Sequence, residues 1–352
     1  LVIEDTDIAV VARGVSSDTY GVRFASSGTT INASNFTFTG GSISVDKNGL
    51  VANSGIFHST IIIRSGAGGT LQIEGADING EVVNQSTTLI LDASPNWWMD
   101  AAGPADGWIR ELPGDIVYNP WYNNAAMTTK TYYVCSDQPY TTIQSAIDAA
   151  APRDTVLVCP GTYNEHLLIT KQLTVKGENK AATIIDGGAT GIVVTIQGTS
   201  GVVFSGFTVQ NSGTDLNAGG GIGLILTTNS VIEDNIIQDN ASGVGLLGSS
   251  GNIVRNNTID GSARYGIVAD QVPDQPTLVS PNNTITGNII TDSGRDGIYV
   301  GKGSHGQTVT NNTISGATGT TEGTVFEGNG IYFWKSINNT VTGNTIFNNV
   351  RY

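Results

Sequence analysis

An Asn residue recurs five times in the last third of the chain, each time after a short β-type run and before a β-branched residue. These residues are Asn235, Asn257, Asn288, Asn312 and Asn344. Pairs of Gly and an apolar residue keep step with them, beginning at Gly223, Gly245, Gly266, Gly297 and Gly330, with spacings of 22, 21, 31 and 33 residues. One coil of about 22 residues, lengthened by about ten in two places, predicts an all-β protein built as a parallel β-helix.

The Asn residues have two physical uses in such a coil. Their short amide side chain tolerates the left-handed backbone region that a sharp bend requires. Stacked coil on coil, the amides can also hydrogen-bond to one another as a ladder. We therefore expect these five residues to be structural.

The composition suits this fold and limits the partners. Gly at 46 residues and charged residues at only 13% favour an all-β protein with many tight turns over a disordered chain. The net charge of −14, with only 16 Lys and Arg, argues against nucleic acid or an anionic membrane as a partner. No apolar run approaches the roughly 20 residues that span a bilayer. Because the chain lacks an initiator Met, we expect it to be mature, processed or a fragment.

The two cysteines, Cys135 and Cys159, each follow a predicted strand. If these strands are neighbours, a disulfide would close a loop of about 25 residues and contribute about 3 kcal/mol. Two buried free thiols are the alternative. The eight Asn-x-Ser/Thr sequons and the scarcity of Lys favour the disulfide and an extracellular, oxidising location.

The sequons fall into two groups. Those at Asn32, Asn35, Asn84 and Asn240 lie in less constrained stretches, and we predict these four as glycosylation sites. Asn256 and Asn311 immediately precede ladder residues, so the repeat itself generates their Asn-Asn-Thr pattern.

The clearest internal boundary falls near residue 130. We expect residues 1–130 to form β-helix coils that end in a cap, with Asn96-Trp97-Trp98 and Pro120-Trp121 near its end. Large rings can cover the open core at the end of a solenoid. Scattered core aromatics are the alternative. Residues 131–352 are then a second β-helix in tandem with the first.

The second part opens with a helix, a turn and a first coil. Ile143, Ala146, Ile147 and Ala150 lie on one helical stripe, which predicts a short capping helix near 143–150. Pro160-Gly161-Thr162-Tyr163 follows, and β-type runs then lead to Gly187. This stretch of almost fifty residues resembles the opening of the pectin-lyase-like superfamily, and is similar to the start of pectin methylesterases and of the NosD-type repeat proteins of microbial surfaces. The resemblance implies a right-handed parallel β-helix but no particular activity.

Enzymes are the first class to test, because catalytic members share this opening. Pectin methylesterases carry a Gln-Asp-Thr and an Asp-Phe-Ile-Phe-Gly segment, and Gln238-Asp239-Asn240 is the nearest match. Polygalacturonase-type hydrolases need paired acids, and the chain has no Asp-Asp pair. Polysaccharide lyases need a Lys or Arg base beside acids that bind calcium, for which Asp292, Arg295, Asp296 and Lys302 are the candidate group. A solvated turn is the stronger interpretation of that segment, so we expect no catalytic set, metal or cofactor, with calcium tied to the lyase alternative.

Two expansions of the coil and three aromatic residues are candidates for a binding face. The expansions are Gln271–Ser280 and Thr318–Glu327, and such loops often form the binding face of a solenoid. Surface loops without a ligand are the alternative. Tyr299, Tyr332 and Trp334 would stack on sugars if they were exposed, but their place beside the Gly-Ile strands favours burial in the core.

These observations favour an extracellular structural protein of an envelope layer, sheath, filament or adhesin. The ladder stops at Asn344 with no legible cap, and free strand edges pair readily with another chain. We therefore expect self-assembly end to end, with copies of the chain as partners. The alternatives are a lyase, hydrolase or epimerase that acts on acidic glycans, and a non-catalytic glycan-binding module. The missing catalytic motifs favour a protein without enzymatic activity.

Overall fold

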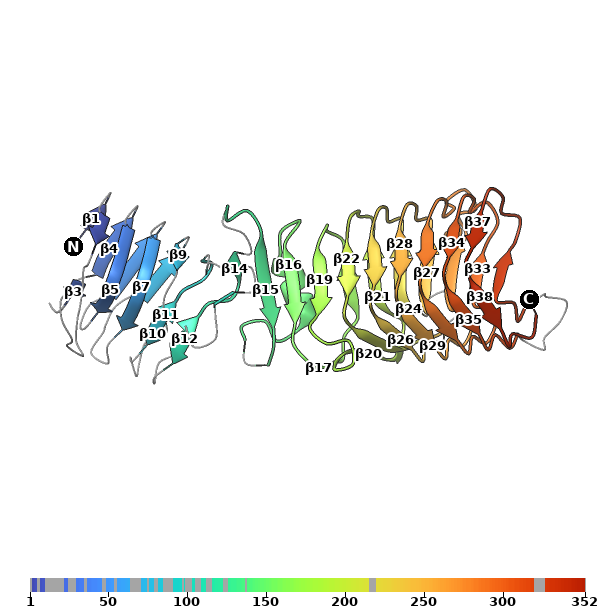
Figure 1. Cartoon of the computed structure of the whole chain (residues 1–352), viewed down its shortest axis with the longest axis horizontal. Helices are drawn as coiled ribbons and strands as arrows, with labels where there is room; N and C mark the ends of the chain where they lie inside the picture. Colours follow the sequence, from blue (N-terminus) through green and yellow to red (C-terminus); the bar gives the residue numbers. More distant parts are fainter. Residues whose placement is uncertain are drawn as a thin grey trace. The chain divides into compact units, whose positions relative to one another are not determined.

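The computed structural model describes residues 2–4, 7–9, 22–24, 30–34, 37–45, 49–53, 56–63, 71–74, 76–78, 82–84, 91–96, 98, 103–104, 109–111, 116–122, 126–136, 138–214, 220–319 and 327–351. The chain forms two compact units, Leu1–Tyr132 (unit 1) and Tyr133–Tyr352 (unit 2) (Figure 1). This division falls close to the boundary expected near residue 130.

Unit 1 contains two sheets of short strands. The first sheet runs in the order β1 (Val2–Glu4), β4 (Thr30–Ser34), β6 (Gly49–Asn53), β8 (Leu71–Glu74), β11 (Leu91–Asp92) and β13 (Ile116–Val117). The second runs β12 (Ile109–Glu111), β10 (Val82–Asn84), β7 (Ile56–Ile63), β5 (Thr37–Val45) and β2 (Asp7–Ala9), with β3 (Val22–Phe24) beside β5 and β9 (Asp77–Ile78) beside β7. The described pairs are parallel, as in a chain that returns to each sheet once per coil.

The predicted cap of unit 1 is described in part. Trp98 is fully buried and Trp121 is 3% exposed, whereas Trp97 lies outside the described residues. Asn96 is also buried, and its amide accepts a hydrogen bond from Ala76 N at 2.8 Å and donates one to Ile73 O at 2.9 Å. Asn96 therefore acts as a corner amide of the kind predicted only for the last third of the chain.

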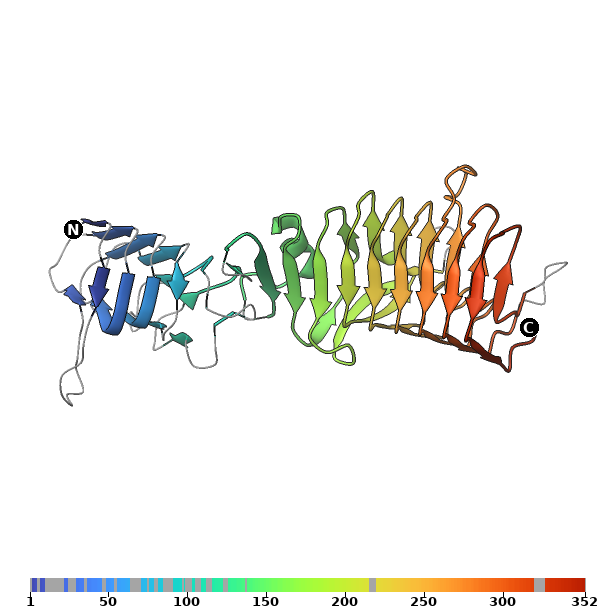
Figure 2. The same cartoon turned by 45° about the horizontal axis from the view of Figure 1, so that its top comes forward.

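Unit 2 is a stack of coils that visit three parallel sheets in turn (Figures 1 and 2). Sheet 1 runs β15 (Lys130–Val134), β16 (Thr155–Val158), β19 (Thr174–Gly177), β22 (Val203–Ser205), β25 (Val231–Glu233), β28 (Ile253–Arg255), β31 (Thr284–Thr286), β34 (Thr308–Thr310) and β37 (Thr340–Thr342). Sheet 2 runs β17 (Gly161–Tyr163), β20 (Thr183–Thr190), β23 (Thr208–Ser212), β26 (Ile236–Gln238), β29 (Thr258–Asp260), β32 (Ile289–Thr291), β35 (Thr313–Ser315) and β38 (Thr345–Phe347). Sheet 3 runs β18 (Leu167–Ile169), β21 (Ile192–Gln197), β24 (Gly220–Ile225), β27 (Val244–Leu247), β30 (Ile267–Asp270), β33 (Ile298–Val300) and β36 (Ile331–Phe333).

The core of unit 2 follows from the alternation of side chains along each strand. In β25, β28 and β31 the central residue is buried and its two neighbours lie towards solvent. The same positions of successive coils stack, so that Ile232, Val254 and Ile285 form one buried column. We call the turns that lead from sheet 3 to sheet 1, from sheet 1 to sheet 2 and from sheet 2 to sheet 3 corner 1, corner 2 and corner 3.

The helix α1 (Ile143–Ala149) covers the first coil, as predicted. Its buried face consists of Ile143, Ala146 and Ile147, which belong to the predicted stripe. The Glu165 carboxylate accepts hydrogen bonds from Ile143 N and Gln144 N, both at 2.9 Å, and so satisfies two first-turn donors. Within the described part of the chain, no helix has the length and apolar character needed to cross a membrane.

The five predicted ladder residues are hydrogen-bonded from coil to coil in corner 2. The side-chain amide of Asn235 donates to Asn257 Oδ1 at 3.1 Å, and the next three steps along the stack repeat this bond at 3.1, 3.0 and 2.9 Å. Each of these oxygens also accepts the backbone N–H of the preceding Asn. A second ladder in corner 1 joins Asn252, Asn283, Gln307 and Asn339. This second ladder was not predicted from the sequence because Gln307 interrupts the Asn pattern.

The backbone role assigned to the ladder Asn residues is wrong. The left-handed conformation falls one residue earlier, at Asp234 (φ 53°), Asn256 (φ 56°) and Gly287 (φ 67°). The bend therefore uses one residue for its backbone conformation and the next for its buried amide. Asn-Asn and Gly-Asn pairs recur at corner 2 because the first residue must adopt the left-handed conformation and the second must supply the buried amide.

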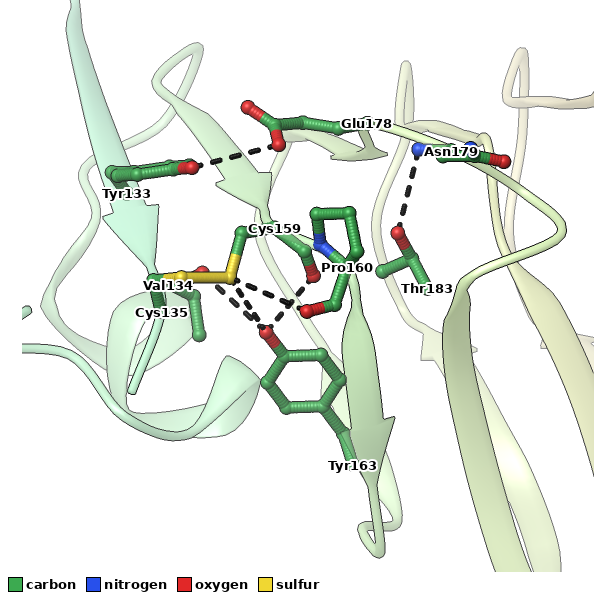
Figure 3. Close-up of a disulfide and its surroundings, with 9 residues drawn as sticks. All are labelled: Tyr133, Val134, Cys135, Cys159, Pro160, Tyr163, Glu178, Asn179 and Thr183. Carbon is green, nitrogen blue, oxygen red and sulfur yellow. Dashed lines mark hydrogen bonds between the residues drawn. A yellow bond between two sulfur atoms is a disulfide. The ribbon is translucent and has the colours of Figure 1, made fainter. Parts of the chain in front are cut away.

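A disulfide joins Cys135 and Cys159, whose Cα atoms are 5.5 Å apart (Figure 3). Their strands are neighbours, since Cys159 N donates to Val134 O at 3.0 Å. The hydroxyl of Tyr163, from the Pro-Gly-Thr-Tyr turn, donates to Cys159 O at 3.0 Å. The disulfide therefore links the segments before and after α1 at the start of unit 2.

Replacing Asn257 by Ala is expected to destabilise unit 2 by about 3 kcal/mol, because buried backbone and amide donors lose their acceptor. Asn235 N and Asn235 Nδ2 both bond to Asn257 Oδ1. Urea unfolding followed by circular dichroism measures the change. Asn256→Gly is the matched control, since this exposed neighbour only has to keep the left-handed backbone. An equal loss in both variants would contradict the ladder's role.

Replacing both Cys135 and Cys159 by Ser should lower the free energy of unfolding by about 3 kcal/mol, because the disulfide spans 24 residues and restricts the unfolded chain. Urea unfolding with and without a thiol reductant tests this. The reductant should destabilise only the unsubstituted protein. If the reduced protein and the double variant differ in their free energy of unfolding, the loss of the cross-link does not explain the whole effect of the substitutions.

Candidate binding cleft

The glycine pairs of sheet 3 occupy two structural positions rather than one. Gly223 pairs with Gly245, and Gly245 pairs with Val268, all within strands. Gly266, Gly297 and Gly330 instead precede their strands, where Val244 N, Ile267 N and Ile298 N donate to their carbonyls. Their equivalents in earlier coils are Gly221 and Gly243. The five repeat glycines were predicted to occupy one equivalent position. That prediction was wrong for Gly223 and Gly245, since the residues equivalent to Gly266 are Gly221 and Gly243.

Packing explains the difference between the two positions. A Cβ atom on Gly221 would lie 2.8 Å from Ile237 Cγ2 and 2.9 Å from Gly243 O, so corner 3 has no room for a side chain. A Cβ atom on Gly245 would meet nothing nearer than Val268 Cγ1 at 3.8 Å, an ordinary contact. Gly245 is therefore not required for packing, and its lack of a side chain leaves the outer face of sheet 3 open.

This open region is a cleft of about 210 Å³ on the outer face of sheet 3. Gly223 and Gly245 form its floor, and its lining includes Ile192, Ser242, Leu247, Arg264, Tyr265, Val268, Asp270, Gln271, Pro273 and Tyr299. Ligand sites are commonly concave and apolar with a few convergent polar groups. Gln271 and Pro273 show that the first coil expansion lines the cleft; this segment is the orange loop that projects from the coil in Figure 2.

Tyrosine side chains form one wall of the cleft. Tyr299 lies in register with Val268 and Tyr332 on the outward side of its strand, because Ile298 and Val300 are buried. The rings of Tyr265 and Tyr299 stack at 5.0 Å between centroids with an interplanar angle of 26°. Tyr299 and Tyr332 lie at 5.8 Å and 52°. Burial of these aromatics in the core, the favoured interpretation of the sequence, is wrong, and Trp334 is 41% exposed.

Two arginines stand against this wall. The guanidinium carbon of Arg264 lies 5.2 Å from the centroid of the Tyr265 ring, and that of Arg295 lies 5.8 Å from it. Arg295 also forms an ion pair with Glu327 at 3.2 Å. Glu327 belongs to the second coil expansion, of which residues 320–326 lie outside the described part. The cleft therefore has a cationic side at Arg264, next to an aromatic face.

Asp270 is the acidic group of the cleft. It ends β30, and its Oδ1 accepts a hydrogen bond from Gln271 N at 2.8 Å. Burial raises the pKa of this carboxyl, and the hydrogen bond from Gln271 offsets only part of that rise. The pKa of the Tyr299 hydroxyl is raised by burial first and by the charge of Asp270 second. The carboxyl of Asp270 therefore interacts electrostatically with the Tyr299 hydroxyl in the lining of the cleft.

The predicted lyase cluster does not assemble. Asp296 is 1% exposed, and its Oδ1 accepts hydrogen bonds from Asn329 N at 2.9 Å and Asn329 Nδ2 at 2.8 Å. Asp292 is an exposed corner residue with φ 51°. Lys302 is exposed after β33, whereas Arg295 and Asp296 precede that strand. Among the described residues, no group of three or more His, Cys, Asp or Glu is placed to hold a metal ion.

Two of the predicted glycosylation sites are buried. Asn84 is 0% and Asn240 is 2% exposed. Asn240 Nδ2 donates to Val209 O at 3.0 Å and Gln238 O at 2.8 Å, so this nitrogen is part of corner 3. These two predictions are wrong because an attached sugar would need that nitrogen at the surface. The side chain of Asn32 and all of Asn35 lie outside the described residues, and both stay predictions.

Tyr265 and Asp270 were not predicted from the sequence, and Gly245 was recognised there only as part of the repeat. A usable signal was present in Gly220-Gly221-Ile222-Gly223, where Gly occupies both sides of an inward-facing Ile. Aligning Ile222, Val244 and Ile267 as buried positions would have separated the corner glycines from the strand glycines. Nothing in the sequence marked Asp270, whose position depends on the coil expansion that follows it.

Replacing Asp270 by Asn is expected to stabilise the protein at neutral pH. Asn keeps the acceptor for Gln271 N but needs no ionisation in a buried place. Because the folded pKa of Asp270 lies above its ordinary value of 3.8, the stability due to this group is greatest at low pH and falls as the pH rises through 3.8 and beyond. Urea unfolding between pH 3 and pH 7 should show the difference between variant and parent shrinking as the pH falls. A difference independent of pH would contradict this account.

Comparison with known proteins supports the fold and leaves the activity open. Residues 175–346 match the family model described as right handed beta helix region. No curated protein matches the chain.

Among solved structures, the Dettilon tailspike protein is similar with a TM-score of 0.40 and 15% identity, over 91% of this chain and 56% of that one. Pectin methylesterase PemA from Erwinia chrysanthemi gives 0.36 and 14%, over 60% of this chain and 80% of that one. A double mutant of the periplasmic alginate epimerase AlgG gives 0.36 and 14%, over 99% and 84%. Likenesses this weak carry no information on activity. The stacked parallel coils and the family match together identify residues 175–346 as a right-handed parallel β-helix.

Proposed function

We propose that the protein is an extracellular β-helix that binds a saccharide in the cleft on sheet 3. The observation that carries the proposal is the combination of an open glycine floor with a tyrosine wall. A pyranose ring has a flat face of C–H groups that packs on an aromatic ring. The small floor at Gly223 and Gly245 lets such a ring approach the backbone of the sheet.

The polar groups of the cleft suit the hydroxyls of a sugar. Asp270 and Ser242 can accept hydrogen bonds, and Arg264 can donate them. An aromatic wall could also stack on a nucleobase, but the net charge of −14 repels a phosphate backbone. A saccharide therefore fits both the shape of the cleft and the charge of the chain.

Catalysis on the same saccharide is the second candidate function, and Asp270 favours it. A carboxyl whose pKa is raised by burial in a cleft is suited to act as a general acid. The structural, self-assembling role favoured by the sequence stays a prediction. Light scattering at high protein concentration tests it, since strictly monomeric behaviour would count against assembly.

Replacing Gly245 by Val should weaken saccharide binding without loss of stability, because the new side chain fills the cleft and a β-branched residue suits a strand. The parent protein is first screened against neutral, uronic acid and amino sugar oligosaccharides, and the best ligand is measured by titration calorimetry. We expect at least about a tenfold loss of affinity, about 1.4 kcal/mol. Tyr299→Ala should weaken the same ligand by removing the stacking face.

Ser205→Val is the control, since Ser205 faces outward on sheet 1. It should leave binding unchanged. A parent protein that binds none of the oligosaccharides would refute the proposal, and binding that survives Gly245→Val would place the site elsewhere. Mass analysis of the incubated saccharide separates binding from catalysis. A product that forms with the parent and not with Asp270→Asn would establish the enzymatic candidate.

A further inference from the structure

Four sequons of unit 2 share a structural position that the predicted sites Asn84 and Asn240 lack. They begin at Asn256, Asn282, Asn311 and Asn338. All four residues have a left-handed backbone, with φ of 56°, 57°, 56° and 58°, and all four are exposed. In each case the next residue belongs to a ladder. The first Asn of each pair is therefore exposed to solvent, and the second supplies an amide that hydrogen-bonds to polar groups of the neighbouring coils.

At Asn282 and Asn311, glycines occupy the same corner position in both neighbouring coils. Asn282 lies in corner 1 between Gly251 and Gly306, because Ile253, Thr284 and Thr308 are in register and each follows its corner residue by the same interval. Asn311 lies in corner 2 between Gly287 and Gly343 for the same reason. Coils are spaced by about 4.8 Å, so corner Asn residues on alternate coils are separated by about 10 Å. A bulky group on Asn282 or Asn311 therefore meets no side chain at the same position of either adjacent coil, whereas Asn256 has Gly287 on one side and Asp234 on the other.

The third residue of each of these sequons is also accessible. Thr258, Thr284, Thr313 and Thr340 each open a strand and face outward, with partly or fully exposed side chains. The tripeptide thus offers both the amide nitrogen and the hydroxyl that define an acceptor. Its origin in the repeat does not matter to a modifying enzyme, which requires only the tripeptide and access to it.

We propose that Asn256, Asn282, Asn311 and Asn338 are N-glycosylation sites. The co-substrate is an oligosaccharide linked through phosphate to a lipid. The side-chain Nδ2 attacks C1 of the linking sugar, the N–C bond forms as the C–O bond to phosphate breaks, the lipid phosphate leaves, and Nδ2 loses one proton to the enzyme's base. The proposal rests on the extracellular location and is independent of any ligand in the cleft.

The folded, unmodified full chain is incubated with a single-subunit oligosaccharyltransferase and a lipid-linked oligosaccharide, and modified Asn residues are mapped by peptide mass spectrometry. An Asn-Ala-Thr peptide in the same reaction verifies that the enzyme is active. We expect glycan on the four corner residues and none on Asn84 or Asn240. Each corner Asn that stays unmodified is removed from the proposal. Modification of none of the four, or of Asn240 in their place, overturns it.

Thr258→Val and Thr313→Val are the matched variants. Each removes the sequon hydroxyl and keeps a β-branched residue at the start of its strand, so the ladder residues Asn257 and Asn312 are untouched. The variants should lose glycan at Asn256 and Asn311 respectively and keep it at Asn282 and Asn338. Unchanged circular dichroism shows that the fold is intact. Glycan that persists at Asn256 in Thr258→Val would show that the sequon is not what the enzyme reads, and would overturn the assignment there.

Discussion

The fold of unit 2 depends on hydrogen bonding at its corners. Within the sheets each backbone group pairs with the coil above or below, but at a corner the chain changes direction and some groups turn inward. Unpaired polar groups in a core are costly. The buried amides of corner 2 meet this cost, since each Asn oxygen accepts two hydrogen bonds from the previous coil. Corner 1 uses the same device with Gln307 in one coil.

These ladders also fix the register of the stack, and the register determines what reaches the surface. Because each amide must meet its counterpart, a coil cannot slip by one residue without reversing the inward and outward sides of every strand. Gly245, Val268 and Tyr299 therefore fall on one outward column although they come from different coils. The cleft is in this sense a consequence of buried polar contacts on other sides of the solenoid.

The sequence predicted the features that depend on local or strictly periodic patterns. The ladder at Asn235 to Asn344, the helix over Ile143 to Ala149 and the pairing of Cys135 with Cys159 are of this kind. The sequence could not predict features for which residues one or two positions apart in the chain have different structural roles. Gly221 and Gly223 both precede an apolar residue, but one fills a tight corner and the other lies in the floor of a cleft.

The sequons show the same limit. Asn240 and Asn256 look alike in the sequence, yet Asn240 is a buried corner amide whereas Asn256 is the exposed residue before one. The same reasoning removes Asp292 from the candidate catalytic group, because it occupies the left-handed position of corner 3. Only the three-dimensional register distinguishes the two members of each corner pair.

The coil expansions explain how such a regular stack can form a cleft of irregular lining. Lengthening a surface loop by about ten residues costs little entropy, and the ladder on either side keeps its register, since Asn257 still bonds to Asn288 across the first expansion. Gln271 and Pro273 of that expansion line the cleft beside Asp270. The second expansion supplies Glu327, whose ion pair with Arg295 holds a guanidinium near the Tyr265 ring. Both expansions adjoin sheet 3. The length of the coil therefore varies beside the cleft, and it stays constant at corner 2, whose amides hydrogen-bond from coil to coil.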